Sequence, residues 1–202
     1  MLDTIVRFLN TGGIVMYALV GVSVLTLAAI LERALYWARH TTARELRALE
    51  RYASLVSSDQ HDAALAIARE DASPQGRLVR VVLESDTPSE ETALVAIETL
   101  RPRFERFGAL LATVITGAPL LGILGTVIGI IESFDLLGRA AGVSDPTVIA
   151  GGIAKALYTT AAGLTIALIA LLPAALYRAR AAATLSRLES LGAALAAPAK
   201  SG

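Results

Sequence analysis

Three long stretches of the chain contain no charged residue, and this is the clearest pattern in the sequence. Residues 8–31, 107–131 and 156–177 are stretches of 24, 25 and 22 residues without Asp, Glu, Lys or Arg. A helix that rises about 1.5 Å per residue needs about 20 residues to cross a bilayer core. A soluble core helix rarely keeps all its faces apolar for that length. The pattern therefore predicts three transmembrane helices, near 13–31, 108–131 and 148–177.

The polar segment 32–106, between the first two predicted spans, has the signals of helices. Small and aliphatic residues recur at helical spacing in SDQHDAALAIARE, and SPQG then breaks the pattern. In TPSEETALVAIETL, Thr87 and Glu90 have capping-box spacing, with Pro88 at the first helical position. The helical pattern then continues through RPRFERFG, interrupted only by Pro102, into the second span. We expect long helices that project from the membrane.

The remaining segments complete an all-α integral membrane protein. The turn-rich LLGRAAGVSDPT predicts a short loop at 132–147, so that the spans at 107–131 and 148–177 are antiparallel neighbours. The alanine-rich residues 178–202 predict a helix that frays toward Ser201. The first span, with the N-terminus at 1–31, is too long for a signal peptide and lacks a small-residue cleavage site, so we expect it to be retained.

The distribution of basic residues predicts the orientation. Fifteen of the 18 Lys and Arg residues lie in 32–106 or 178–202. The positive-inside rule then places these two segments in the cytoplasm and the N-terminus and the 132–147 loop outside. The formal net charge is zero, which implies no surface for nucleic acid.

Few residues could carry enzyme chemistry or hold a metal. The chain has no cysteine, and its two histidines, His40 and His61, do not have metal-ligand spacing. The sequence also lacks a phosphate loop and a nucleophile–base arrangement. We therefore expect neither an enzyme nor a bound cofactor.

The second and third spans contain small and weakly polar residues at helical spacing. Gly122, Gly125 and Gly129 recur every three or four residues in GAPLLGILGTVIGIIESF, and Thr126 and Ser133 lie seven apart on an adjoining face. The third span has a similar side, formed by Thr159, Thr160, Gly163 and Thr165. Two such faces suggest close packing around something polar, although a single threonine can equally bond back to its own helix.

These residues carry a family resemblance. GAPLLGILGTVIGIIESF resembles the second-span signature of the MotA/TolQ/ExbB proton-channel family, and GGIAKALYTTAAGLTIALIALLPAALY resembles its third-span signature. GGIVMYALVGVSVLTLAAILERALYW looks like the first span of the ExbB-like members, and SPQGRLVRVVLE resembles, less specifically, the cytoplasmic region.

The resemblance implies a bacterial inner-membrane subunit that assembles as a ring, a pentamer in the ExbB-like branch. The ring would enclose a single-span ExbD- or TolR-like partner whose membrane aspartate carries H⁺ or Na⁺. Ion flow would deliver work to the periplasm or outer membrane, for example through a TonB- or TolA-like protein. By position, Thr126 and Thr160 match the family's pore-lining threonines.

Lys155 departs from the family pattern, which has GIAEAL where this chain has GIAKAL. If Thr126 and Thr160 lie at one depth, Glu132 and Lys155 are about 9 and 7.5 Å further outward on antiparallel helices. Lys155 is then either an interfacial anchor or a pore-facing cation that pairs with Glu132 or with the partner's aspartate.

Three functions remain open on the sequence alone. The first is a force-transmitting ion-channel subunit, and the second is a non-conducting scaffold with the same ring architecture. The third is a small secondary transporter, which the absence of inverted repeats and broken helices disfavours.

Overall fold

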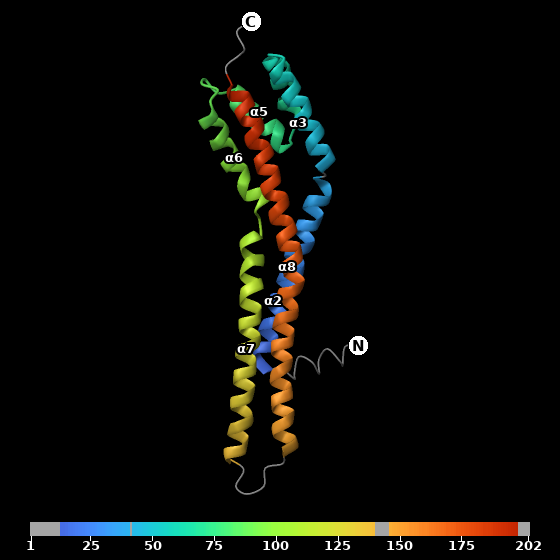
Figure 1. The fold of residues 1–202 in the computed structure, drawn as a ribbon, viewed down its shortest axis with the longest axis vertical. Helices are drawn as coiled ribbons and strands as arrows, with labels where there is room; N and C mark the ends of the chain where they lie inside the picture. The colour runs from blue at the N-terminus through green and yellow to red at the C-terminus, as the bar shows by residue number, and fades with distance from the viewer. Residues whose placement is uncertain (1–12, 41, 140–145, 198–202) are drawn as a thin grey trace. The chain divides into compact units, whose positions relative to one another are not determined.

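A computed structural model describes residues 13–40, 42–139 and 146–197, and every regular element in this part of the chain is an α-helix (Figure 1). The predicted all-α class is therefore confirmed. The chain divides into two compact units, with residues 1–32 and 107–175 in the first and 33–106 and 176–202 in the second. The helices are α2 (Gly13–Arg39), α3 (Thr42–Ser57), α4 (His61–Glu70), α5 (Pro74–Leu83), α6 (Glu90–Phe104), α7 (Gly108–Arg139) and α8 (Pro146–Ala196).

Three helices are long and apolar enough to cross a membrane, as the charge-free stretches predicted. They lie within Gly13–Arg39, Gly108–Asp135 and Ala150–Ala196. Each continues beyond the predicted span, since a charged residue ends an apolar stretch without ending a helix. Helix α7 in particular runs through Glu132 to Arg139, where a loop beginning at 132 was expected. The predicted N-terminal segment and the centre of the 132–147 loop lie outside the described residues.

The first unit packs parts of α2, α7 and α8 together through aliphatic and small side chains. Its buried cluster contains no aromatic residue and comprises Val15, Leu19, Val114, Ala118 and Ala170. Most of the larger apolar side chains on these helices are instead exposed on the single chain, including Leu120, Leu168 and Leu172 at 66%, 67% and 69%. These exposed side chains are suited to lipid or to another protein chain.

The second unit has a core of larger side chains. Helices α4, α5 and α6 contribute Ala68, Leu78 and Ile97, and α8 contributes a stripe of leucines. The largest fully buried side chains of this core are Tyr52, Phe104, Leu78, Ile97 and Leu188.

Asp71 organises the connection between α4 and α5. Its carboxylate accepts hydrogen bonds from Tyr52 Oη at 2.8 Å and from Ser73 N and Oγ at 2.8 and 2.7 Å. Ser73 is also the N-cap of α5, whose first residue is Pro74. Burial favours the neutral form of Asp71, but the bonds from Ser73 and Tyr52 outweigh it and lower its pKa. The SPQG stretch thus follows the end of α4 and provides the N-cap and the first residues of α5.

The expected continuous helix from the cytoplasmic segment into the second span is wrong. Helix α6 ends at Phe104 and α7 begins at Gly108, with Phe107 in the left-handed region at φ 61°. Pro102 has already removed one backbone donor from the last turn of α6. The buried Arg33 donates from Nη1 to the carbonyl of Arg103 at 2.9 Å, which satisfies one of the acceptors that the helix end leaves unpaired.

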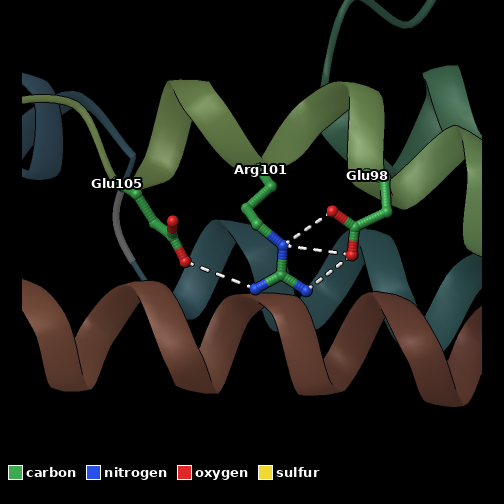
Figure 2. Close-up of polar contacts among 3 residues, drawn as sticks. All are labelled: Glu98, Arg101 and Glu105. Atoms are coloured by element: carbon green, nitrogen blue, oxygen red, sulfur yellow. Dashed lines mark hydrogen bonds and ion pairs between the residues drawn. The ribbon is translucent and has the colours of Figure 1, made fainter.

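A half-buried arginine bridges the same end of α6. Arg101 donates to both carboxylate oxygens of Glu98 at 2.8 to 3.1 Å and to Glu105 at 3.3 Å (Figure 2). The hydrogen bonds from Arg101 lower the pKa of Glu98, and they raise the pKa of Arg101 itself. The start of α6 also differs from the prediction: the N-cap is Ser89, whose Oγ accepts from Thr92 N at 3.2 Å, and Thr87 lies outside the helix.

Candidate functional site

Helices α7 and α8 run side by side in the first unit (Figure 1), and their contact is made through glycines. A Cβ atom placed on Gly122 would lie 2.8 Å from the carbonyl oxygen of Thr159 and 2.9 Å from the Cα of Thr160. A Cβ on Gly163 would overlap the carbonyl oxygen of Ala118. At these two positions backbone meets backbone, so only glycine fits.

The other two glycines singled out from the sequence lie on α7 and face side chains of α8. A Cβ on Gly125 would lie 2.5 Å from Thr159 Oγ1, and one on Gly129 would lie 2.7 Å from the Cβ of Ala156. All four glycines therefore lie at the α7–α8 contact. The close approach brings backbone carbonyls of one helix within reach of hydroxyls of the other.

Thr126 and Thr160 meet across this contact, with their hydroxyls hydrogen-bonded to each other. Thr160 Oγ1 lies 3.0 Å from the carbonyl of Gly122, and Thr126 Oγ1 lies 3.1 Å from the carbonyl of Ala156. Each hydroxyl has one proton to donate. Three arrangements are therefore available. Thr126 can donate to Thr160, which donates to Gly122. Alternatively, Thr160 donates to Thr126, which donates to Ala156 or, at 3.2 Å, to the Gly122 carbonyl of its own helix.

Thr159 is a third member of this cluster that was not among the predicted pore residues. It is 1% exposed, and its hydroxyl lies 2.7 Å from the carbonyl of Ala156 and 3.0 Å from that of Gly122. Its position four residues before Gly163 places both on one helix face, and this spacing was the available signal. Thr165 differs, since it is exposed and bonds back to Ala161 O at 2.7 Å.

Lys155 and Glu132 are not brought together within one chain. Lys155 is half-buried on α8, whereas Glu132 is exposed on α7. Neither forms an ion pair with another residue in the part of the chain that the structure describes. A pairing across two copies, or with the partner's aspartate, stays a prediction.

Comparison with known proteins identifies the family. The sequence model of the MotA/TolQ/ExbB proton channel family matches residues 70–190. The chain belongs to this family. The matched range contains the four glycines and the three threonines of the α7–α8 contact, together with Glu132 and Lys155.

Several curated relatives are similar over half of the chain or more. The putative biopolymer transport protein ExbB-like 3 of Synechocystis is 34% identical over 172 residues, which cover 83% of this chain and 81% of that protein. ExbB-like 1 of the same organism is 37% identical over 80% of this chain and 65% of its own length. The biopolymer transport protein exbB1 of Vibrio cholerae is 40% identical over 50% of this chain and 44% of its own length. The similarity thus supports the ExbB-like branch of the family.

Proposed function

We propose that this chain is an ExbB/TolQ-like inner-membrane subunit of an ion-driven machine that transmits energy to the periplasm or outer membrane. Family membership and the biopolymer-transport names of the relatives support the general role. The observation that carries the ion path is the cluster of Thr126 and Thr160 hydroxyls with the Gly122 and Ala156 carbonyls, inside a pair of apolar helices. Such a cluster can orient water or a carboxylate beside it.

The path requires an ion carrier from another chain. The stretches 107–131 and 156–177 contain no carboxylate, and threonine hydroxyls do not release protons at ordinary pH. We therefore infer a ring, of five copies, around the helix of a single-span ExbD/TolR-like partner with a membrane aspartate. The apolar side chains exposed on the single chain are suited to such an assembly. Native mass spectrometry in mild detergent tests the ring and identifies the co-purifying partner.

The energy available sets the scale of the coupling. One elementary charge moving through 100 mV releases about 2.3 kcal/mol, so useful work requires several ions or strong coupling. In the proposed orientation, residues 32–106 and the C-terminus are cytoplasmic, and ions enter from the N-terminal side of the membrane. We propose H⁺ as the ion, and flux measured with either a pH gradient or a Na⁺ gradient decides between the two.

Valine substitutions test the threonine cluster. Thr126→Val and Thr160→Val keep the side-chain shape but remove the hydroxyl, so we expect an intact ring with reduced ion flux in liposomes that contain the partner. The double variant should lose most of the flux. Thr165→Val is the matched control, since this threonine is exposed and bonds only to Ala161 O among the described residues. Unchanged flux in all three cluster variants would remove Thr126 and Thr160 from the ion path.

We further propose that Lys155 pairs with Glu132 of a neighbouring copy or with the partner's aspartate, and so limits proton leak. Lys155→Glu should weaken assembly or uncouple flux, because it places two acids together. Adding Glu132→Lys should restore part of the loss if these two residues are the pair. If Lys155→Ala and Lys155→Glu both behave like the unmodified protein, the lysine is only an interfacial anchor.

A second candidate is a non-conducting scaffold of the same ring architecture. The specific observation in its favour is that the Thr126 and Thr160 hydroxyls already bond to each other and to carbonyls of their own chain. The replacement of the family's glutamate by Lys155 points the same way. An assembled ring that carries no flux with its partner under either gradient would establish this function.

A further inference from the structure

The second unit contains a pocket that the ion path does not use. It has a volume of about 500 Å³ and lies among the end of α2, the start of α3 and the C-terminal half of α8. All of its lining residues belong to the second unit. The polar side chains that matter below are Trp37, His40, Glu45, Arg180, Thr184 and Arg187.

Two residues that line this pocket each have a buried polar atom without a hydrogen-bond partner among the described residues. These atoms are the indole Nε1 of Trp37 and Oε1 of Glu45, in residues that are only 4% and 8% exposed. The other carboxylate oxygen of Glu45 is served by Thr184 Oγ1 at 3.4 Å and by Arg187 Nη1 at 3.6 Å. An unpaired buried donor or acceptor costs free energy. The pocket therefore suits a ligand that both accepts from Trp37 and donates to Glu45.

The charge of the pocket favours an anion. Arg180 and Arg187 both line it, and Arg180 forms no ion pair with a described residue. Glu45 offsets one of these charges, so an excess positive charge remains. His40 donates from Nδ1 to the carbonyl of Tyr36, 2.9 Å away, so Nε2 of the neutral ring is an acceptor and adds no donor for an anion. Arginine next to an indole N–H is a suitable pair of donors for phosphate oxygens.

The position of the pocket along the helices corresponds to a membrane surface. On α8, Arg180 comes three residues, or about 4.5 Å, after Tyr177, the last residue of the charge-free stretch. On α2, Trp37 comes six residues, or about 9 Å, after Leu31, where the first charge-free stretch ends. The headgroup layer is about 5–8 Å thick on each side of the hydrocarbon. Tryptophan and tyrosine are enriched at this level.

We propose that this pocket binds the headgroup of an anionic glycerophospholipid. The phosphate accepts from Arg180 and from Trp37 Nε1, and a headgroup hydroxyl donates to Glu45 Oε1. A phosphatidylglycerol headgroup supplies both parts, because it combines a phosphodiester with a diol. Phosphatidylcholine supplies neither a net negative charge nor a donor. Soluble phosphate has the same recognition chemistry, but the depth of Arg180, which falls within the headgroup layer, favours a group anchored in the bilayer.

Trp37 provides the assay, since it is the single tryptophan of the chain. The purified protein is titrated in mixed micelles with three lipids that carry identical brominated acyl chains: phosphatidylglycerol, phosphatidylmethanol and phosphatidylcholine. Bromine quenches indole fluorescence at short range. Loss of a charge-assisted hydrogen bond corresponds to roughly a tenfold change in affinity. We expect phosphatidylglycerol to quench at roughly tenfold lower concentration than phosphatidylcholine, with phosphatidylmethanol between them.

Two arginine variants give the matched comparison. Arg180→Gln should abolish the preference for phosphatidylglycerol, whereas Arg178→Gln, two residues earlier on α8 and outside the pocket, should keep it. Both side chains are exposed, so both variants should fold, which circular dichroism checks. Equal quenching by the three lipids, or an equal effect of the two substitutions, would overturn the proposal. Complete relief of quenching by millimolar inorganic phosphate would instead assign the pocket to a soluble anion.

Discussion

The two halves of α8 pack by different chemistry, although they belong to one continuous helix. In the first unit, the buried face consists of small residues at spacings of three and four: Ala156, Thr159, Gly163, Ala167, Ala170 and Ala174. In the second unit the buried face keeps the helical spacing but consists largely of leucine: Ala181, Leu185, Leu188, Leu191 and Leu195. The change occurs close to Tyr177, where the third charge-free stretch ends.

The difference follows from what surrounds each half. In water, burying leucine removes apolar surface from solvent, at roughly 25 cal/mol per Å². Between helices in lipid this gain is absent, so close contact and hydrogen bonds have to hold the helices together. Gly122 and Gly163 allow that contact, and Thr159 and Thr160 form the bonds. The two units should therefore respond oppositely to changes in side-chain size.

The largest effect is expected from a smaller side chain in the second unit. Leu188 is fully buried, and Leu188→Ala should destabilise that unit by about 2–5 kcal/mol because it leaves a cavity. Hydrogen exchange of the α4–α6 amides and the unfolding transition of Trp37, which packs in this core, measure the loss. Leu94→Ala is the control, since Leu94 is 48% exposed on α6. An equal loss in both variants would contradict the role of the leucine stripe.

A larger side chain should break the first unit. Gly163→Ala places a methyl group against the Ala118 carbonyl, and overpacking of this kind costs about 1–3 kcal/mol. We expect faster hydrogen exchange in α7 and in residues 150–175 of α8. Gly117→Ala on α7 serves as the control, because a Cβ there meets nothing within 4 Å. Protection that is unchanged in Gly163→Ala would mean that the backbone contact does not hold α7 and α8 together.

Much of this contrast was predictable from local sequence. The length of the charge-free stretches identified the three apolar helices, because about 20 residues without a charge are enough to cross a bilayer core. Glycine spacing identified Gly122, Gly125 and Gly129, which lie at the α7–α8 contact, because small residues at intervals of three and four share one helix face. Gly163 was identified with the threonines of the third span. Thr126 and Thr160, for which an equal depth was assumed, are hydrogen-bonded to each other.

Features that depend on distant residues were not predictable. The break before α7 involves Arg33, which is 70 positions away from the Arg103 carbonyl that it serves. Phe107 adopts a left-handed backbone conformation although it is not glycine, so the residue type at this position gives no turn signal. The pocket was missed for the same reason, since Glu45 meets Thr184 139 positions away.

A moderate effect is expected at Glu45, the buried acid of the second unit. Burial raises its pKa above the usual 4.5, despite Arg187 and Thr184, which lower it. Because the pKa of Glu45 is higher in the folded state than in the unfolded state, its contribution to stability is present at pH values below the ordinary pKa. That contribution is lost as pH rises through the pKa of the folded state. Glu45→Gln should therefore stabilise the unit at pH 7 and flatten this part of its pH dependence. Denaturant unfolding between pH 4 and 8, followed through Trp37, gives the profile; a variant that is less stable at pH 7 would show that pairing outweighs burial.

The smallest effect is expected at the exposed cluster on α6 (Figure 2). The hydrogen bond from Arg101 lowers the pKa of Glu98. This pair therefore contributes to stability at pH values above the ordinary pKa of 4.5, and the contribution is lost as pH falls through the pKa of the folded state. The pH dependence has the opposite sign to that of Glu45. The side chain of Glu98 is 61% exposed, and water and salt screen the attraction. Glu98→Gln should therefore shift the Trp37 unfolding transition slightly at low ionic strength and not measurably in 0.5 M salt. A loss as large as that of Leu188→Ala, persisting in salt, would mean that surface charge rather than leucine burial holds the second unit together.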